Sequence, residues 1–499
     1  MRVRVRVRSI EALTPYSSLL TLGGLLATEA TSLPRTLGLR DLVLFNVVAV
    51  LSLRWLATAA AAGPSSLTLW VLAALFFFIP QGLAVAELAS RFPDEGGIYS
   101  WAKRAFGDSH GFLCGWCYWV NNLLYYPNLL ISTAVIATFV VGRGNTDLVN
   151  NWSYVLPATL GMLWFATFMN IVGLGTGKWL QNIGAIASYL PGVALMGFGI
   201  WAFVHRGSAT PITPSSLVPD LADFSSINLW ATIAFAFAGL ELCSVMAGET
   251  KDPARTLPRS IFLSAPFIIL LYLAGTASVL WLIPTDKVNV VSGFLQAVAA
   301  GAEAAGSVVA WLVPGMALLY VIGNIGGIGA WLTGPARVAF MIGIDRYFPP
   351  AFGRIHPKWK TPYVAILVQS SFATIFLFLS VLGKGTTVEK AYLIILDTML
   401  LVYFIPYLYL FTAYLLFTRR NPSPTARGIK PWLVAIAGLG LTLLAMGVAV
   451  VPPSDTPSVL LFELKVVGGA LGFVVIGLAV YWRGRRREMG DGRQETGHA

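Results

Sequence analysis

Charged residues are scarce in this sequence of 499 residues, making up only 11% of the chain. Soluble proteins carry about 25% charged residues. Hydrophobic residues make up 56%, and the mean hydropathy is +0.72. This balance excludes an ordinary soluble enzyme, because most of the chain suits helices of about 20 apolar residues that cross a bilayer. The sequence therefore predicts an all-α integral membrane protein.

Cysteine and histidine are also rare, with three and four copies. Cys114, Cys117 and Cys243 fall inside apolar runs, which argues against an extracellular disulfide framework. The histidines lie in loops, at span ends or in the tail, so we expect no catalytic residues, no metal site and no cofactor. The GxxxxGK[ST] pattern of nucleotide hydrolases is missing too, so a transporter of this kind would use ion gradients or exchange.

Apolar runs are what the chain has in abundance, and they predict twelve transmembrane helices. The long runs lack the alternating polarity of β-barrel strands. The predicted spans are 41–62, 67–90, 110–141, 153–173, 180–204, 227–248, 260–283, 306–334, 362–382, 390–417, 431–451 and 459–482. An Ala-rich stretch ending the 284–305 connection predicts a short additional helix.

Lysine and arginine are distributed unequally between the two sides of these spans. With a cytoplasmic N-terminus, most of them fall in cytoplasmic segments, including a loop from Arg337 to Lys360. The positive-inside rule then predicts that both termini are cytoplasmic. The net charge of +11 is spread over the loops and does not form one patch, so we expect no nucleic-acid partner. The expected environment of the chain is the lipid bilayer.

Polar groups inside the membrane are costly and mark functional positions. In the first span, the guanidinium of Arg54 lies too deep to reach the interface and should face the interior. Two interpretations stay open: Arg54 binds substrate, or it pairs with Glu241, the one opposite charge near the centre of span 6. The residues at this point of span 1 are Ser52, Leu53, Arg54 and Trp55.

Two further spans carry polar or unusually small residues. In span 6, small residues around Gly239 lie next to Glu241, which suits a broken helix whose backbone faces a cavity. The alternative is a tightly packed helix. Span 3 carries phenols and amides at helical spacing, for which we favour cavity lining over interhelical hydrogen bonding: Tyr118, Asn121, Asn122, Tyr125 and Tyr126.

Several motifs in order resemble the amino acid-polyamine-organocation (APC) permeases, over residues 38–483. They are LGLRDLVLFNVV, FIPQGLAVAELASRFPDEGGIYSWAKRAFG, FAFAGLELCSVMAGETKDPARTLPRSI, WLTGPARVAFMIGIDRYFPPAFGRIHPKWKTP and IPYLY. The resemblance implies the LeuT-like fold, a five-plus-five inverted repeat over 41–417 with helices 1 and 6 unwound. Helices 11 and 12 would follow at 431–482, between a 1–40 tail and a basic tail at 483–499.

The same resemblance implies roles for particular residues. Half-helix N-termini would hold a substrate carboxylate, and free carbonyls its amino group. Phe235 resembles the aromatic gate, Ala238 and Gly239 the unwound backbone, and Glu241 an acid tied to proton sensing or gating. Trp331 is similar to an aromatic residue below the site that also takes part in gating. The span 3 lining would be Tyr118, Asn121, Asn122 and Tyr126.

The sequence departs from the family at two places. The Gly-Ser/Thr-Gly run of span 1 is replaced by residues 52–55, and Ser188 stands where some relatives have a proton-coupling lysine. Sodium coupling, other proton sites and simple exchange therefore stay open. We expect a secondary transporter in the cell membrane that moves an amino acid or related small amine by alternating access. The alternatives are a polyamine or other organocation permease, or a non-transporting amino acid sensor, and the oligomeric state stays open.

Overall fold

The computed structural model describes residues 35–140, 148, 151–219, 231–306, 311–381, 388–420, 430–451 and 458–495. Within these ranges the chain is almost entirely helical, and one isolated bridge joins Leu37 to Thr250. In the part of the chain that the structure describes, eleven helices are long and apolar enough to cross a membrane, by length and composition. The predicted class is therefore confirmed, whereas the count of twelve spans stays a prediction.

The helices follow the predicted spans closely along the described chain. In the first half they are α2 (Leu39–Val50), α3 (Arg54–Ala61), α4 (Ser65–Ala73), the π-helical turn η1 (Ala74–Phe78), α5 (Ile79–Arg91), α6 (Ile98–Phe106), α7 (Asp108–Ala137), η2 (Thr138–Val140), α9 (Trp152–Val172) and α10 (Leu174–Arg206). The second half has η3 (Leu240–Glu249), α12 (Pro253–Leu282), η4 (Thr285–Lys287), α13 (Gly293–Ala305), α15 (Leu312–Ile344), η5 (Pro350–Gly353), α16 (Tyr363–Val381), α17 (Val388–Arg420), α18 (Pro431–Ala449) and α19 (Val459–Glu495). The predicted short helix of the 284–305 connection is confirmed as α13.

Two helices run ten residues or more past the predicted ends of their spans. The span predicted to end at 334 continues in α15 to Ile344, and the last one continues in α19 to Glu495. Arg337, predicted in a loop, is consequently a buried residue of α15. Its charge is compatible with the interior because it has an acidic partner, which hydropathy of a single segment does not reveal.

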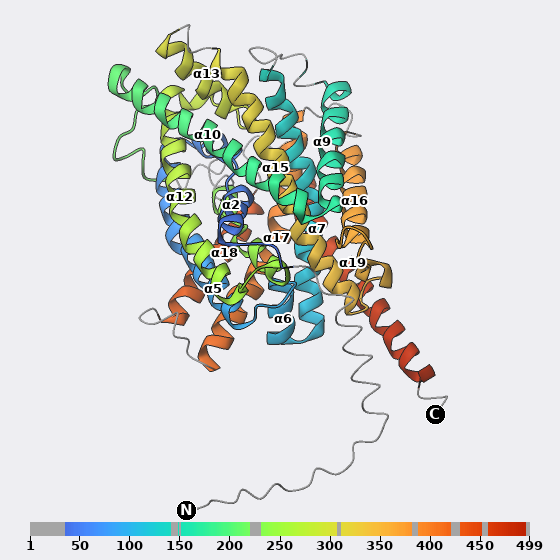
Figure 1. Ribbon diagram of the computed structural model, residues 1–499. Helices are drawn as coiled ribbons and strands as arrows, with labels where there is room; N and C mark the ends of the chain where they lie inside the picture. The colour runs from blue at the N-terminus through green and yellow to red at the C-terminus, as the bar shows by residue number, and fades with distance from the viewer. Residues whose placement is uncertain are drawn as a thin grey trace, which may run out of the picture.

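The helices form one bundle in which spans distant in the sequence meet. α7 packs against both α15 and α17, and α10 packs against α12 and α15. Figure 1 shows α7, α15 and α17 near the middle of the bundle, α12 along its left side, and α6 and α13 at opposite ends. The three cysteines are buried in this interior and are free thiols.

Candidate functional site

The first span is interrupted in the middle of the bundle. α2 ends at Val50 and α3 begins at Arg54, and Leu51 between them is extended, with φ −74° and ψ 111°. No side chain caps the N-terminus of α3. All four residues predicted here are buried at the interruption: Ser52, Leu53, Arg54 and Trp55.

The sixth span is interrupted as well. Helical residues 231–236 lead into a turn at 237–239, after which the chain continues as the 3-10 helix η3. Gly239 has φ +124°, which side chains rarely tolerate, and a Cβ there would lie 3.1 Å from Trp331 and 3.3 Å from Val50. Glycine is therefore required, and the two interruptions lie against each other. Their position at the membrane midplane stays a prediction.

Tyr272 of α12 links the two interruptions. Its hydroxyl lies 2.6 Å from the carbonyl oxygen of Val50 and 3.1 Å from that of Ala236. It also accepts a hydrogen bond from the backbone N–H of Ser52 at 3.2 Å. Tyr272 thus satisfies backbone groups that both broken helices leave free. Sequence analysis missed it, although it is a lone phenol in the apolar run FIILLYLAG.

Glu241 is held by uncharged donors from several spans. Its Oε1 accepts from the hydroxyls of Tyr403 at 2.5 Å and Tyr118 at 3.2 Å. Its Oε2 accepts from the Tyr407 hydroxyl at 2.6 Å, from Gln81 Nε2 at 2.8 Å and from the Gly239 N–H at 3.0 Å. The carboxylate therefore joins η3 to α5, α7 and α17. Of its side-chain donors, only Tyr118 was singled out from the sequence.

The predicted pair between Arg54 and Glu241 is wrong. Arg54 Nη1 donates to the side-chain oxygen of Asn128, and the guanidinium lies 4.1 Å from the ring centroid of Trp55 and 5.1 Å from that of Tyr125. The physical reason is that the neutral donors around Glu241 already use its acceptor positions. Arg54 does face the interior, as predicted, and its exposed fraction is 0%.

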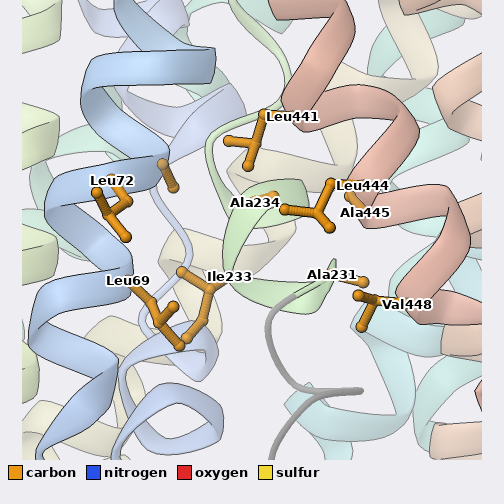
Figure 2. Close-up of a pocket in the computed structure, with 10 residues that line it drawn as sticks. Leu69, Leu72, Ala231, Ile233, Ala234, Leu441, Leu444, Ala445 and Val448 are labelled. Carbon is orange, nitrogen blue, oxygen red and sulfur yellow. The ribbon is translucent and has the colours of Figure 1, made fainter. Parts of the chain in front are cut away.

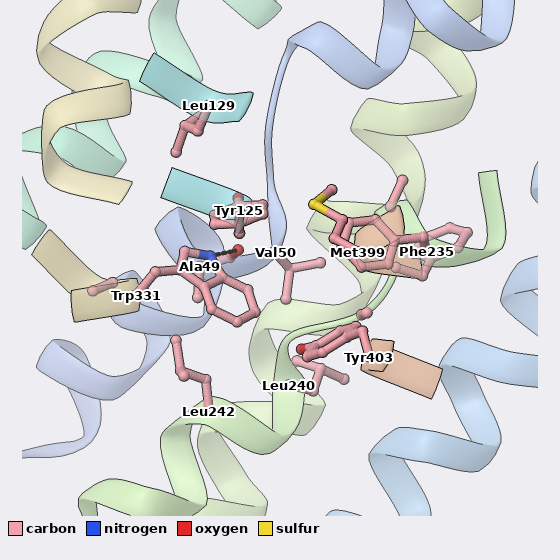
Figure 3. Close-up of a cluster of buried hydrophobic side chains, with 14 of the residues drawn as sticks. Ala49, Val50, Tyr125, Leu129, Phe235, Leu240, Leu242, Trp331, Met399 and Tyr403 are labelled. Carbon is pink, nitrogen blue, oxygen red and sulfur yellow. Dashed lines mark hydrogen bonds between the residues drawn. The ribbon is translucent and has the colours of Figure 1, made fainter. Parts of the chain in front are cut away.

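Aromatic side chains surround the two interruptions. The Trp331 indole donates to the carbonyl oxygen of Ala49 at 2.8 Å, and Tyr126 donates to the carbonyl oxygen of Trp331 at 2.8 Å. Phe235 packs edge-on against Trp55 and Tyr403, with centroids 5.7 and 5.2 Å apart. Figure 3 shows Trp331, Tyr403 and Phe235 gathered around Val50. The predicted gate residues Phe235 and Trp331 thus contact the broken segments.

The remaining predicted residues are less directly connected to this centre. Asn122 donates to the carbonyl oxygen of Tyr118 in its own helix at 2.7 Å. Asn121 is buried with no partner for its side-chain oxygen, and Ala238 is buried in the turn before Gly239. The residues that sequence analysis missed come mainly from other spans, namely Gln81, Asn128, Tyr272, Tyr403 and Tyr407.

A second charged cluster lies where η3 ends. Arg337 holds Glu249 through two hydrogen bonds, from Nε to Oε2 and from Nη2 to Oε1, the latter 2.7 Å long. Glu95 approaches the same end: a Cβ on Gly248 would lie 3.2 Å from its Oε2. Burial raises the pKa of the Glu95 carboxyl from the ordinary 4.5 to about 7, the Arg337 guanidinium lowers it, and the Glu249 carboxylate raises it.

Two further features of the described chain bear on where a ligand could bind. No group of three or more metal-ligating side chains occurs in the ranges that the structure describes. A pocket between α4, residues 231–236 and α18 is lined by Leu, Ala, Ile and Val only, as Figure 2 shows. Such a pocket has no polar group to orient a polar ligand, so it is not the candidate site.

Comparisons with known proteins identify relatives of this chain. The family model described as amino acid permease matches residues 37–470. An uncharacterized transporter of Legionella pneumophila is 31% identical over 452 residues, covering 89% of this chain and 96% of that protein. The probable agmatine/putrescine antiporter AguD of Lactococcus lactis is 23% identical over 429 residues, covering 84% of this chain and 89% of AguD.

A solved structure shows the same fold. The crystal structure of MhsT in complex with L-phenylalanine matches with a TM-score of 0.59 at 14% identity, over 85% of this chain and 98% of MhsT. The fold and the matches define a membrane transporter of the LeuT-like type and not an enzyme. The chain belongs to the amino acid permease family, within the APC superfamily inferred from its motifs. Transporters of this family typically need no cofactor.

Proposed function

We propose that this protein is a secondary transporter that moves an amino acid across the cell membrane by alternating access, as an exchanger or an ion-coupled symporter. The observation that carries the proposal is the contact between the two interrupted helices at Gly239, Val50 and Trp331. Interrupted helices expose backbone N–H and carbonyl groups that bind the charged ends of an amino acid. The substrate would bind between spans 1, 3, 6 and 8.

The connections around Glu241 support a role for this residue in gating. Its carboxylate bonds to donors on α5, α7 and α17, so a movement of span 6 relative to these helices must exchange or break those bonds. Phe235 and Trp331 cover the interruptions on either side and would act as the aromatic gates. All the predicted substrate residues are buried, which fits a closed state of the cycle.

The similarity to the probable agmatine/putrescine antiporter AguD favours a second candidate, exchange of agmatine or putrescine. These amines carry positive charge and no carboxylate. A binding site for them would be expected to offer an uncompensated anion. Glu241 is the buried acid at the centre, and its oxygens already accept several hydrogen bonds. We therefore rank diamine exchange second.

Counterflow in liposomes tests the proposal. The full-length chain is reconstituted, loaded with an unlabelled amino acid mixture or with putrescine, and challenged with labelled solutes, with and without sodium and at two pH values. Accumulation driven by amino acids supports the proposal, and a requirement for sodium or protons identifies the coupling. Accumulation driven by putrescine alone would favour the second candidate. Absence of exchange for every solute would contradict transport and would favour the alternative of a non-transporting amino acid sensor.

Two glutamine substitutions, one at Glu241 and a control at Glu463, test the proposed role in gating. Glu241→Gln should slow exchange strongly, because an amide donates where the carboxylate accepts. Glu463→Gln changes an exposed residue of α19 and should exchange like the wild type.

We also propose that both termini are cytoplasmic. A C-terminal cleavable tag that protease removes from inside-out but not from right-side-out vesicles would support this orientation.

A further inference from the structure

Arg54 is a buried cation with an unused edge. Its guanidinium is 0% exposed, and its Nε and Nη2 have no hydrogen-bond partner, while Nη1 bonds to Asn128. Nε and Nη2 form one side of the planar guanidinium fork, the side that can bind a carboxylate with two parallel hydrogen bonds. The structure thus leaves a bidentate donor pair in the interior without an acceptor.

Arg337 shows how this chain satisfies the same edge elsewhere. In Arg337 it is Nε and Nη2 that donate to the two oxygens of Glu249, while Nη1 donates to the Thr333 carbonyl oxygen at 2.7 Å. Arg54 has the matching neutral contact through Nη1 to Asn128, but its other edge has no carboxylate. The two residues therefore differ by one bound carboxylate.

The surroundings of Arg54 make this missing partner costly. Arginine stays protonated in proteins, and a buried charge without a partner strongly destabilises the folded state. The position makes this worse, because Arg54 is the first residue of α3, where the helix dipole is already positive. The rings of Trp55 and Tyr125 give partial compensation through cation–π contacts. Among the described side chains, no ion pair reaches Arg54.

We propose that the Nε and Nη2 edge of Arg54 binds a carboxylate of the transported solute and so selects carboxylate-bearing solutes over diamines. This inference rests on the proposed function and names the substrate class of the same site. The N-terminus of α3 adds to the attraction for an anion. The carboxylate can come from the α-position of an amino acid or from its side chain, and the experiment separates these two sources.

Ligand binding to the purified full-length chain in detergent tests the proposal by thermal shift. The probes are L-alanine, L-glutamate, γ-aminobutyrate and putrescine, because a ligand that binds the folded state raises its melting temperature. Wild type should respond to carboxylate-bearing probes and not to putrescine. Arg54→Gln should weaken that binding at least 10-fold, and Arg54→Lys should bind with intermediate affinity because it keeps the charge but loses the fork.

The pattern of losses identifies the source of the carboxylate. Equal weakening of alanine and glutamate assigns Arg54 to the α-carboxylate, and weakening of glutamate alone assigns it to the side chain. Arg206→Gln, a substitution of an exposed arginine, is the matched control and should bind like wild type. Unchanged affinities in Arg54→Gln, stabilisation by putrescine in wild type, or a response to chloride but to none of the carboxylates would overturn the proposal.

A second measurement decides the case in which no probe shifts wild type. Arg54→Met removes the buried charge while keeping a long side chain, so without ligand its melting temperature should equal or exceed that of wild type. A lower melting temperature would mean that Arg54 is a structural residue, and the inference would be wrong. Failure of the transport proposal appears separately, as the absence of counterflow in wild-type liposomes.

Discussion

The centre of the bundle and the end of η3 each hold a buried acid and a buried arginine, but only one of the two regions pairs them. At the end of η3, Arg337 and Glu249 neutralise each other. At the centre, Glu241 is held by phenols, an amide and a backbone N–H, and Arg54 by an amide and two rings. The paired charges are complete without a ligand, and so are the acceptor positions of Glu241, whereas Arg54 keeps a guanidinium edge without an acceptor. We take this difference to separate a structural ion pair from the proposed binding site.

The largest effect is expected from breaking the complete pair. Arg337→Met alone leaves Glu249 as an uncompensated buried charge, and the cost should be about 3–5 kcal/mol. Thermal or denaturant unfolding of the detergent-purified protein measures this loss. The double variant Arg337→Met, Glu249→Gln should recover part of it. A loss below about 1 kcal/mol for the single variant would mean that the pair is not sealed from water.

A smaller loss of stability is expected when one of the neutral hydrogen-bond donors around Glu241 is removed. Tyr407→Phe removes a hydroxyl that bonds to the carboxylate at 2.6 Å and lies 3.0 Å from the Gly239 N–H. Removing one donor from a buried acceptor costs about 1–3 kcal/mol. Tyr409→Phe, one half-turn away on the same helix, removes a hydroxyl that contacts His110 and should cost less. Equal losses in both variants would argue against a special role of the central donors.

The end of η3 should respond to pH through Glu95. Because the pKa of Glu95 is raised to about 7, the folded protein favours the protonated carboxyl. The contribution of Glu95 to the stability of the folded protein is therefore full below about pH 4.5 and is lost as the pH rises through about 7. Arg337 and Glu249 face this carboxyl, and the adjoining pocket carries Asp94, Tyr99, Ser100, Lys103, Arg104, Asp108 and Asp345.

Comparison of variants isolates this contribution. The melting temperature of wild type minus that of Glu95→Gln should decline between about pH 4.5 and pH 7 and stay constant above it. Other titrating groups are common to both proteins and cancel in the difference. A difference that rises with pH, or one that does not change, would contradict the raised pKa.

The smallest effect is expected at a partly exposed ion pair. Lys103 bonds to Asp345 at 2.7 Å, and the two side chains are 30% and 24% exposed. Pairs of this kind contribute about 0–1 kcal/mol. Lys103→Met should therefore change the free energy of unfolding far less than Arg337→Met. A loss of similar size would show that the exposure of an ion pair does not predict its contribution to stability.

Much of the fold follows from local sequence properties. The predicted span 431–451 corresponds to α18, which covers Pro431–Ala449, because a long apolar run with polar flanks determines a helix by itself. The end of α15 was predicted too early because Arg337 looked like a loop residue. Its partner Glu249 lies 88 positions away in the sequence, so hydropathy of the segment carries no sign of it.

The candidate site was predicted only in part, because the sequence of one span does not show which residues of other spans it contacts. Residues 52–55 and Gly239 follow from a deep charge and from a glycine beside an acid, both readable within one span. Tyr272 and Asn128 were missed because a single polar residue in an apolar helix does not indicate which span it meets. The wrong pairing of Arg54 with Glu241 came from matching opposite charges without knowing the neutral donors nearby.

The sequence by itself determined the class of this protein, its family and the positions of most helices, because span length, hydropathy and motifs are properties of continuous segments. Only the tertiary structure decided the partners of the buried charges. Glu241 meets side chains from α5, α7 and α17, and its bond to Gln81 crosses 160 positions of sequence. Such contacts depend on which helix faces touch after packing, and that arrangement leaves Arg54 with a free edge.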